Sequence, residues 1–172
     1  RYLGGLRENG GQYTHAAVWF LKALAMLGEA AQAEEVMNML NPVNHALTPQ
    51  QTAVYKGEAY VVAGDVYSCG DNAGRSGWTW YTGAAAWMYA VFLEDILGVK
   101  LQGDRLNFEP CLPPEWDKVT IELLYGQSSY RIELFNPEGR STGVHSLLMD
   151  GKPCGEIVLK DDKAAHYIKI VI

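Results

Sequence analysis

The chain has 172 residues, of which 48% are hydrophobic and 20% charged, and its formal net charge is −6. This composition is typical of one or two globular units, and the acidic balance argues against a nucleic-acid binder, which needs basic patches to neutralise phosphates. Three cysteines, Cys69, Cys111 and Cys154, form no CxxC pair, so we expect buried, reduced thiols rather than a zinc site or a disulfide framework.

The first half of the chain predicts helices. Residues 13–28 are apolar on nearly every face, which is typical of a helix buried on several sides. Residues 30–40 predict a second helix, paired antiparallel with the first through a short connection. Thr48, Pro49 and Gln51 form a capping-box pattern that begins a third, short helix.

Three further segments complete this half. Residues 58–67 mix Val, Ala and Tyr around one glycine, and we expect a helix there. Residues 68–76 are rich in Gly and Asn and predict a surface loop. Residues 84–97 predict the last helix, with Gly98 as its stop.

The pattern changes after Gly98 from helical to alternating. Two alternating runs, 118–124 and 129–135, flank Gly126 and Gln127 and predict a β-hairpin. We expect further short strands at residues 105–108, 144–149, 156–159 and 166–172. Strands at this spacing with turn residues between them indicate a β-sandwich.

We therefore expect two domains, residues 1–98 with helices and residues 99–172 with a small antiparallel β-sandwich-like fold. The helical part has too few helices to close a core by itself. Its nearly all-apolar first helix needs neighbours that this chain does not supply. These two observations lead us to expect a C-terminal fragment of a longer protein.

Two helix starts are candidate anion sites. His15 follows two glycines and lies in the first turn of a predicted helix, where unpaired N–H groups and the helix dipole favour an anion. The alternative is a histidine satisfied in the core. Thr82 and Gly83 form a second such start, where a hydroxyl and N–H groups suit an oxyanion. The alternative there is an ordinary N-cap.

Other polar residues are weaker candidates. Glu8, Asp65 and Asp71 are carboxylates near predicted loops, and we expect each to solvate its loop rather than to bind a sugar hydroxyl. The β half offers no cluster of functional side chains, and we expect its His145 and His166 to lie on strand surfaces. The sequence predicts no metal site.

Several long segments resemble one known family. They are RENGGQYTHAA (residues 7–17), LNPVNHA (40–46), AYVVAGDVYS (59–68), GRSGWTWYTG (74–83), LQGDRL (101–106) and PCLPPEW (110–116). Together they strongly resemble glycoside hydrolase family 94, which includes cellobiose and chitobiose phosphorylases. Within the family they look most like the phosphorylase-like C-terminal region of cyclic β-1,2-glucan synthases and like 1,2-β-oligoglucan phosphorylases.

The resemblance implies the last helices of an (α/α)6 barrel followed by the β-sandwich-like domain. It also implies that the whole protein cleaves a β-glucosidic bond with inorganic phosphate and inverts the anomeric centre, giving α-glucose 1-phosphate. His15 matches the phosphate-contacting histidine of the family. Thr82 and Gly83 match its phosphate-contacting Thr-Gly pair.

The resemblance also suggests a sugar-binding edge. Tyr2 and Arg7 fall at positions that contact the acceptor sugar in cellobiose phosphorylases, and we add the neighbouring Glu8 as a substrate-binding candidate. Arg7 stands where those enzymes often have lysine. This departure fits a β-1,2 rather than a β-1,4 linkage.

The family's general acid is an aspartate upstream of this stretch, so we assign no catalytic residue here and expect the fragment alone to be inactive. Inorganic phosphate is the expected co-substrate, with no metal or organic cofactor. The expected partners are an oligosaccharide and a second copy of the protein. We expect a cytoplasmic protein or the cytoplasmic part of an inner-membrane protein.

Two alternatives remain open. The region can be a non-catalytic module that binds carbohydrate or controls chain length in a membrane-bound cyclic β-1,2-glucan synthase. It can also belong to a cellobiose-type phosphorylase.

Overall fold

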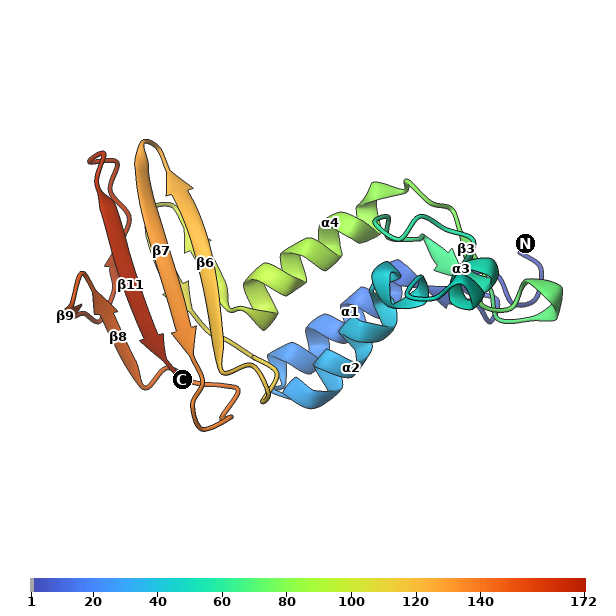
Figure 1. Cartoon of the computed structure of the whole chain (residues 1–172), viewed down its shortest axis with the longest axis horizontal. Helices are drawn as coiled ribbons and strands as arrows, with labels where there is room; N and C mark the ends of the chain where they lie inside the picture. Colours follow the sequence, from blue (N-terminus) through green and yellow to red (C-terminus); the bar gives the residue numbers. More distant parts are fainter. Residues whose placement is uncertain (1) are drawn as a thin grey trace. The chain divides into compact units, whose positions relative to one another are not determined.

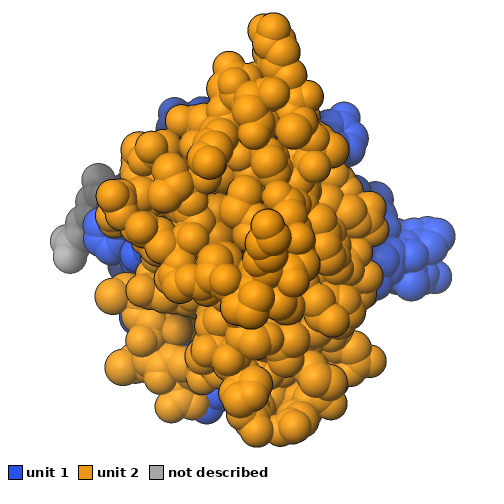
Figure 2. Space-filling view, turned by 90° about the vertical axis from the view of Figure 1, so that its left-hand side faces the viewer, with its two compact units in different colours: residues 1–24, 32–91 blue, residues 25–31, 92–172 orange. Residues whose placement is uncertain are grey.

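The computed structural model describes residues 2–172 and divides into two compact units. The first unit holds the chain up to residue 24 together with residues 32–91, and the second holds residues 25–31 and 92–172 (Figure 2). Helices dominate the first unit and strands the second. The change from helices to strands predicted from the sequence is confirmed.

Four α-helices form in the first half of the chain (Figure 1). Their bounds are α1 Thr14–Met26, α2 Ala30–Leu40, α3 Pro49–Tyr55 and α4 Thr82–Val91, with two 3-10 turns at Pro42–His45 and Gly70–Asn72. The helices predicted at 13–28 and 30–40 are confirmed. In α1, Val18 and Leu21 are fully buried, but Trp19 and Phe20 are more than half exposed. Helix α1 therefore carries more apolar side chains than the described chain buries.

The start of α3 follows its predicted cap. The Thr48 hydroxyl accepts the backbone N–H of Gln51 at 3.2 Å, and Pro49 occupies the first turn. Lys56 ends the helix in a left-handed conformation with φ 54°. This start is confirmed because every signal for it is local.

The helix predicted at residues 58–67 is wrong. The segment begins with a turn, in which the Val61 N–H donates to the carbonyl of Glu58, and ends in strand β2 (Asp65–Val66), which pairs antiparallel with both β1 (Gln12–Tyr13) and β3 (Ser76–Gly77). Gly64 donates its N–H to the carbonyl of Gly77 at 3.1 Å and accepts the N–H of Thr14 at 3.1 Å. Hydrogen bonds to distant segments thus replace the helical ones, where β-branched Val61 and Val62 already weaken helix propensity.

The last predicted helix forms, but its final turn is π-helical and therefore wider than an α-helical turn. A π-helical turn, Phe92–Ile96, follows α4, and the N–H of Leu97 donates to the carbonyl of Phe92 at 2.9 Å. Gly98 then stops it with φ +71°. A Cβ at Gly98 would lie 2.2 Å from the nitrogen of Pro110, so only glycine fits there.

The second unit contains two sheets. The three-stranded sheet has the order β10-β5-β4, and the five-stranded sheet has the order β6-β7-β11-β8-β9. The bounds are β4 Val99–Gln102, β5 Arg105–Phe108, β6 Lys118–Tyr125, β7 Ser128–Phe135, β8 Ser146–Met149, β9 Lys152–Pro153, β10 Ile157–Val158 and β11 Ala165–Val171. The predicted hairpin is confirmed as β6 and β7, which pair antiparallel over their full length.

One strand pair departs from the antiparallel sheet that we predicted. β11 pairs parallel with β7, from Ala165 opposite Ser129 to Val171 opposite Phe135, whereas the other pairs are antiparallel. Figure 1 shows β11 beside β7 with both arrows in the same direction. Alternation along a strand is the same for both pairings, so the sequence pattern could not distinguish them.

One apolar core joins the two sheets of the second unit. It is formed by side chains of both, including Leu106 and Ile157 from the small sheet and Ile132, Leu134 and Ile168 from the large one. All five are almost completely buried. Two sheets that share one core in this way form a two-layer β-sandwich.

Within residues 2–172, no helix is both long and apolar enough to cross a membrane.

Candidate functional site

His15 lies in the first turn of α1, directly after strand β1. The buried Thr14 before it is fixed by its N–H, which donates to Gly64. The His15 ring is half-buried among aromatic rings, with centroid distances of 5.2 Å to Trp19 and 6.0 Å to Trp87. The imidazole is therefore held at the start of the helix, not enclosed in the core.

Thr82 and Gly83 begin α4 and are both exposed. A Cβ built on Gly83 would meet no atom within 4 Å, and the backbone of Gly83 is not in the left-handed region. Within the described chain, neither packing nor backbone conformation requires a glycine there. The amide N–H groups of this first turn have no helical carbonyl to bond.

A small cavity brings the two helix starts together. It has a volume of about 80 Å³ and is lined by Arg7, Tyr13, His15, Gly64, Tyr81, Gly83 and Ala84. His15 and Gly83, predicted from separate motifs, thus border the same space with Arg7. Thr82, Tyr2 and Glu8 are not among its lining residues. Two helix N-termini, an imidazole and a guanidinium at one cavity favour an anion.

The guanidinium of Arg7 is surrounded by aromatic rings. Its central carbon Cζ lies 4.2 Å from the ring centroid of Trp78 and between 5.3 and 5.8 Å from those of Tyr2, Tyr81 and Tyr13. A cation within about 6 Å of an aromatic face is attracted by the ring quadrupole. Of the remaining substrate candidates, Tyr2 belongs to this group of rings, whereas Glu8 is exposed.

Asp65 differs from its prediction as a loop-solvating carboxylate. It is fully buried, and its Oδ2 accepts the backbone N–H of Arg7 at 3.2 Å. Burial raises the pKa of Asp65, against the lowering effect of that hydrogen bond and of the Arg7 charge. Asp71, by contrast, is exposed in its loop. Sequence reasoning missed Asp65 because its burial depends on pairing of β2 with two distant strands.

The β unit does contain a side-chain cluster, contrary to prediction. Nδ1 of His166 lies 2.8 Å from Asp150 and Nε2 lies 3.1 Å from Asp162, while the ring stacks on Tyr130 at 4.7 Å. The His166 side chain is only 11% exposed, so it is not a strand-surface residue. His145 is exposed, as predicted. The hydrogen bond that His166 donates to Asp150, more than the one that it donates to Asp162, raises the pKa of His166.

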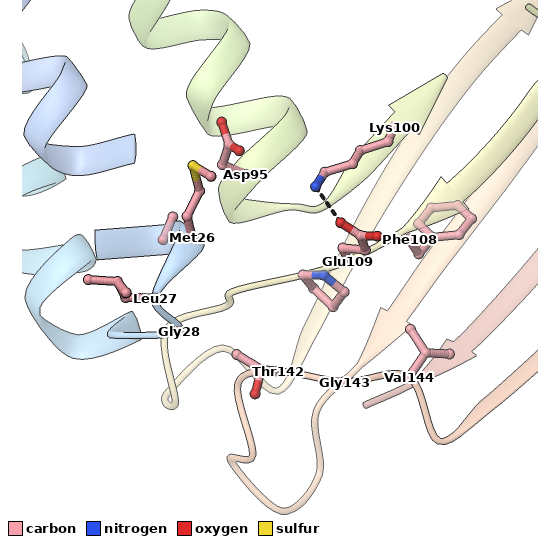
Figure 3. Close-up of a pocket in the computed structure, with 12 residues that line it drawn as sticks. Met26, Leu27, Gly28, Asp95, Lys100, Phe108, Glu109, Thr142, Gly143 and Val144 are labelled. Carbon is pink, nitrogen blue, oxygen red and sulfur yellow. Dashed lines mark hydrogen bonds and ion pairs between the residues drawn. The ribbon is translucent and has the colours of Figure 1, made fainter. Parts of the chain in front are cut away.

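A larger hollow of about 550 Å³ lies within the second unit (Figure 3). Its polar lining includes an ion pair between Lys100 and Glu109, and its apolar lining includes Met26, Leu27 and Val144. None of the site residues predicted from the sequence lines it. We therefore place the candidate site at the smaller cavity of the first unit.

The three cysteines differ in burial. Cys69, Cys111 and Cys154 are all free thiols, but of the three expected to be buried, Cys69 is exposed and Cys154 is half-buried. Cys69 lies in the loop beside the exposed 3-10 turn, so no sheet or helix covers it. No group of three or more His, Cys, Asp or Glu side chains that could hold a metal ion occurs in residues 2–172.

Comparison with known protein families identifies the chain. Residues 1–98 match the glycosyl hydrolase 94 superfamily, catalytic domain. The chain belongs to this superfamily. Residues 99–141 match the glycosyl hydrolase family 65, C-terminal domain. The family 94 resemblance drawn from the sequence segments is thereby confirmed.

Three relatives illustrate the range of similarity. The chain is 47% identical over 133 residues to the cyclic beta-(1,2)-glucan synthase of Rhizobium meliloti (strain 1021), a match that covers 77% of the chain. It is 28% identical over its whole length to the N,N'-diacetylchitobiose phosphorylase of Vibrio furnissii. It is 27% identical, over 68% of its length, to the 1,2-beta-oligoglucan phosphorylase of Listeria innocua serovar 6a.

The chain corresponds to a small part of each relative. The matches span 5% of the glucan synthase, 21% of the chitobiose phosphorylase and 12% of the oligoglucan phosphorylase. By name, these relatives are two glycoside phosphorylases and a glucan synthase.

Proposed function

We propose that this chain is the C-terminal part of an inverting glycoside phosphorylase, in which it supplies part of the phosphate site and the acceptor-sugar edge. One observation carries the proposal: His15 and Gly83 line a single cavity together with Arg7. These residues come from separate segments of the chain, and each of the two helix starts was selected as an anion candidate on its own. Their common cavity has the chemistry of an oxyanion site.

The residues would divide the work as follows. The imidazole of His15, the hydroxyl of Thr82 and the N–H of Gly83 donate hydrogen bonds to phosphate oxygens. Tyr2, Arg7 and Glu8 contact the acceptor sugar. The missing side chain at Gly83 allows a phosphate to approach the backbone, which fits the empty space around its Cβ position.

In the proposed reaction, an oxygen of inorganic phosphate attacks the anomeric carbon from the face opposite the glycosidic bond. That bond breaks, and an acid protonates the leaving oxygen of the acceptor sugar. The products are α-glucose 1-phosphate and the shortened sugar. We assign the acid to an aspartate upstream of this chain, and phosphate is the only co-substrate. We therefore propose that residues 1–172 alone are inactive.

We also propose that residues 1–98 complete an (α/α)6 barrel and that residues 99–172 form the domain that follows it. Exposed aromatic and apolar side chains support this. Trp19 and Phe20 are 56% and 57% exposed, and Met26 and Tyr89 about 70%. So much exposed apolar surface on helices needs a covering partner, which further barrel helices would supply. The two family matches also meet between residues 98 and 99.

The proposed substrate is a β-1,2-glucan or a related oligosaccharide. The similarity to a cyclic beta-(1,2)-glucan synthase and to a 1,2-beta-oligoglucan phosphorylase supports this choice. A cellobiose-type β-1,4 substrate is the alternative within the same chemistry. Incubation with phosphate and either β-1,2 or β-1,4 oligosaccharides separates the two, because only the true substrate releases glucose 1-phosphate.

A second function is a non-catalytic module that binds carbohydrate or controls chain length. The 47% identity to a glucan synthase favours it, because that relative is named for synthesis rather than phosphorolysis. The residue at the upstream acid position separates the two functions. An aspartate there supports the enzyme, and its absence supports the module.

We propose a cytoplasmic location for the chain, which the three free thiols support because reducing compartments keep thiols unpaired. We also propose that the full-length protein is a homodimer. Light scattering on that protein would measure its mass in solution. A monomer would contradict this part of the proposal.

The deciding experiment compares His15→Ala with His145→Ala in the full-length protein. His145 is an exposed histidine of the second unit and serves as the control. Loss of a donor to the phosphate should lower kcat/KM for phosphate about 100-fold or more, by analogy with oxyanion donors. The His145 variant should match wild type. Unchanged phosphorolysis in the His15 variant would reject the assigned phosphate site.

A further inference from the structure

Asp65 is a fully buried carboxylate directly behind the proposed sugar edge. Its Oδ2 accepts the Arg7 backbone N–H, and its Oδ1 has no hydrogen-bond partner within the described chain. A buried charge is costly unless another charge or several donors compensate it. Burial raises the pKa of Asp65, while the Arg7 backbone N–H and, to a smaller extent, the Arg7 charge lower it. Arg7 is therefore the residue that compensates Asp65.

The chain leaves space for this carboxylate. Strand β3 pairs with β2 so that Gly77 lies opposite Asp65. A Cβ at Gly77 would lie 2.5 Å from Oδ1 of Asp65 and 2.6 Å from the Tyr67 ring. Any side chain at this position would therefore displace both groups. Strand register and the missing side chain together hold Asp65 in place.

Arg7 depends on this arrangement through its backbone. Its φ is 45°, a left-handed conformation that costs a non-glycine residue free energy unless its surroundings hold it. Two hydrogen bonds do so: the Arg7 N–H donates to Asp65, and the Arg7 carbonyl accepts the N–H of Gly11 at 2.9 Å. The first of these ends on the buried carboxylate.

The side chain of Arg7 also depends on Asp65. Aromatic rings surround the guanidinium, and its Nε is buried with no hydrogen-bond partner within the described chain. Aromatic faces attract the cation but do not accept hydrogen bonds in its plane. The charges of Arg7 and Asp65 attract each other, and this attraction adds to that of the rings.

We propose that Asp65 is a positioning residue for Arg7. It fixes the left-handed backbone by one hydrogen bond and keeps the guanidinium against the aromatic rings by its charge, so that Arg7 presents a constant geometry to the acceptor sugar. The proposal rests on the proposed function in one respect, the contact between Arg7 and the acceptor.

The test is Asp65→Asn in the full-length protein. The amide keeps an oxygen for the Arg7 N–H but removes the charge, so the variant isolates the electrostatic part. We expect the KM for the acceptor sugar, measured in synthesis from α-glucose 1-phosphate, to rise about tenfold, the usual scale for a hydrogen-bonded charge. The KM for phosphate, which depends chiefly on His15 and Gly83, should rise less than the acceptor KM, although Arg7 also lines the phosphate cavity.

Two controls separate positioning from a general loss of structure. Asp71→Asn removes an exposed carboxylate of the neighbouring loop and should change neither KM. In an Arg7→Gln background, Asp65→Asn should raise the acceptor KM no further, because its effect passes through Arg7. Equal rises in both KM values, or a full additional rise in the Arg7→Gln background, would overturn the proposal.

Crystal structures of the full-length wild type and Asp65→Asn give a readout that does not depend on activity. We expect Arg7 to leave the Trp78 face in the variant. Retention of Arg7 on that face would overturn the proposal, even if the wild type proved not to be a phosphorylase. If the variant does not fold, the wild type with bound acceptor decides. Arg7 between Asp65 and the sugar supports the proposal, and direct contact of Asp65 with the sugar overturns it.

Discussion

The guanidinium carbon of Arg7 lies 4.2 Å from the ring centroid of Trp78, and both residues have left-handed backbones, with φ of 45° and 55°. A non-glycine residue in this region of backbone space is uncommon, and here two such residues contact each other through their side chains. Such strain gathers at functional sites, where the surrounding structure holds it. The pair therefore marks the sugar edge of the proposed site.

Trp78→Leu should raise the KM for the acceptor sugar. The lost cation–π attraction is worth about 0.5–2 kcal/mol, which corresponds to a rise of roughly 2- to 30-fold. Steady-state synthesis from α-glucose 1-phosphate measures it. Trp80→Leu is the matched control, because Trp80 is 64% exposed and bonds to Glu58 instead of facing Arg7. Equal effects of the two variants would remove Trp78 from the site.

Thr48→Ala should destabilise the protein by about 1 kcal/mol, the usual value of a lost N-cap. The substitution leaves the Gln51 N–H without its hydroxyl acceptor. Urea unfolding of the full-length protein measures the change, and Thr48→Ser, which keeps the hydroxyl, should stay near wild type. If serine and alanine destabilise equally, the cap does not stabilise α3.

The position of this cap shows what the sequence could predict. Thr48, Pro49 and Gln51 act within one turn, so their pattern determines the helix start without help from the rest of the fold. The starts of α1 and α4 were found for the same reason, and with them His15 and Gly83. Local signals therefore located the helix ends that carry the proposed phosphate site.

Features set by contacts between distant segments could not be predicted. Residues 58–67 have a mixed pattern, and their non-helical form depends on pairing of β2 with β1 and β3. The burial of Asp65 depends on the same pairing and on the space at Gly77. The parallel pairing of β7 with β11 and the stacking of His166 on Tyr130 join residues more than thirty positions apart. No window of sequence contains these contacts.

The hydrogen bonds of His166 with Asp150 and Asp162 predict that the stability of the protein has a maximum at an intermediate pH. The pKa of His166 is raised above its ordinary 6.5, chiefly by Asp150, so its contribution is complete below pH 6.5 and is lost as pH rises through the folded value. The pKa values of Asp150 and Asp162 are lowered below 3.8, so their contribution is lost only as pH falls through the folded values. Thermal unfolding of the full-length protein as a function of pH measures the loss of stability on the alkaline side and on the acid side.

His166→Gln should remove the loss of stability on the alkaline side of this profile, because an amide does not titrate. His145→Gln, a substitution at the exposed histidine, should leave the profile unchanged. A wild-type melting temperature that stays flat from pH 5 to pH 8 would mean that the hydrogen bonds of His166 do not contribute to stability.

Gly98→Ala should be much more destabilising than Gly103→Ala. Both glycines have positive φ, +71° and +65°, so either substitution carries the backbone cost of about 1–2 kcal/mol for a left-handed residue. Only at Gly98 would the new Cβ also meet the backbone of Glu109 and Pro110, because Gly103 has open space. Chemical denaturation compares them, and equal losses would show that the chain relaxes freely after the π-helical turn.

The most direct test of the central claim is a crystal structure of the full-length protein with bound phosphate. We expect a phosphate in the cavity between the starts of α1 and α4, with its oxygens within hydrogen-bonding distance of the His15 ring and the Gly83 N–H. A phosphate bound elsewhere, with this cavity filled by water or by another segment of the protein, would contradict it.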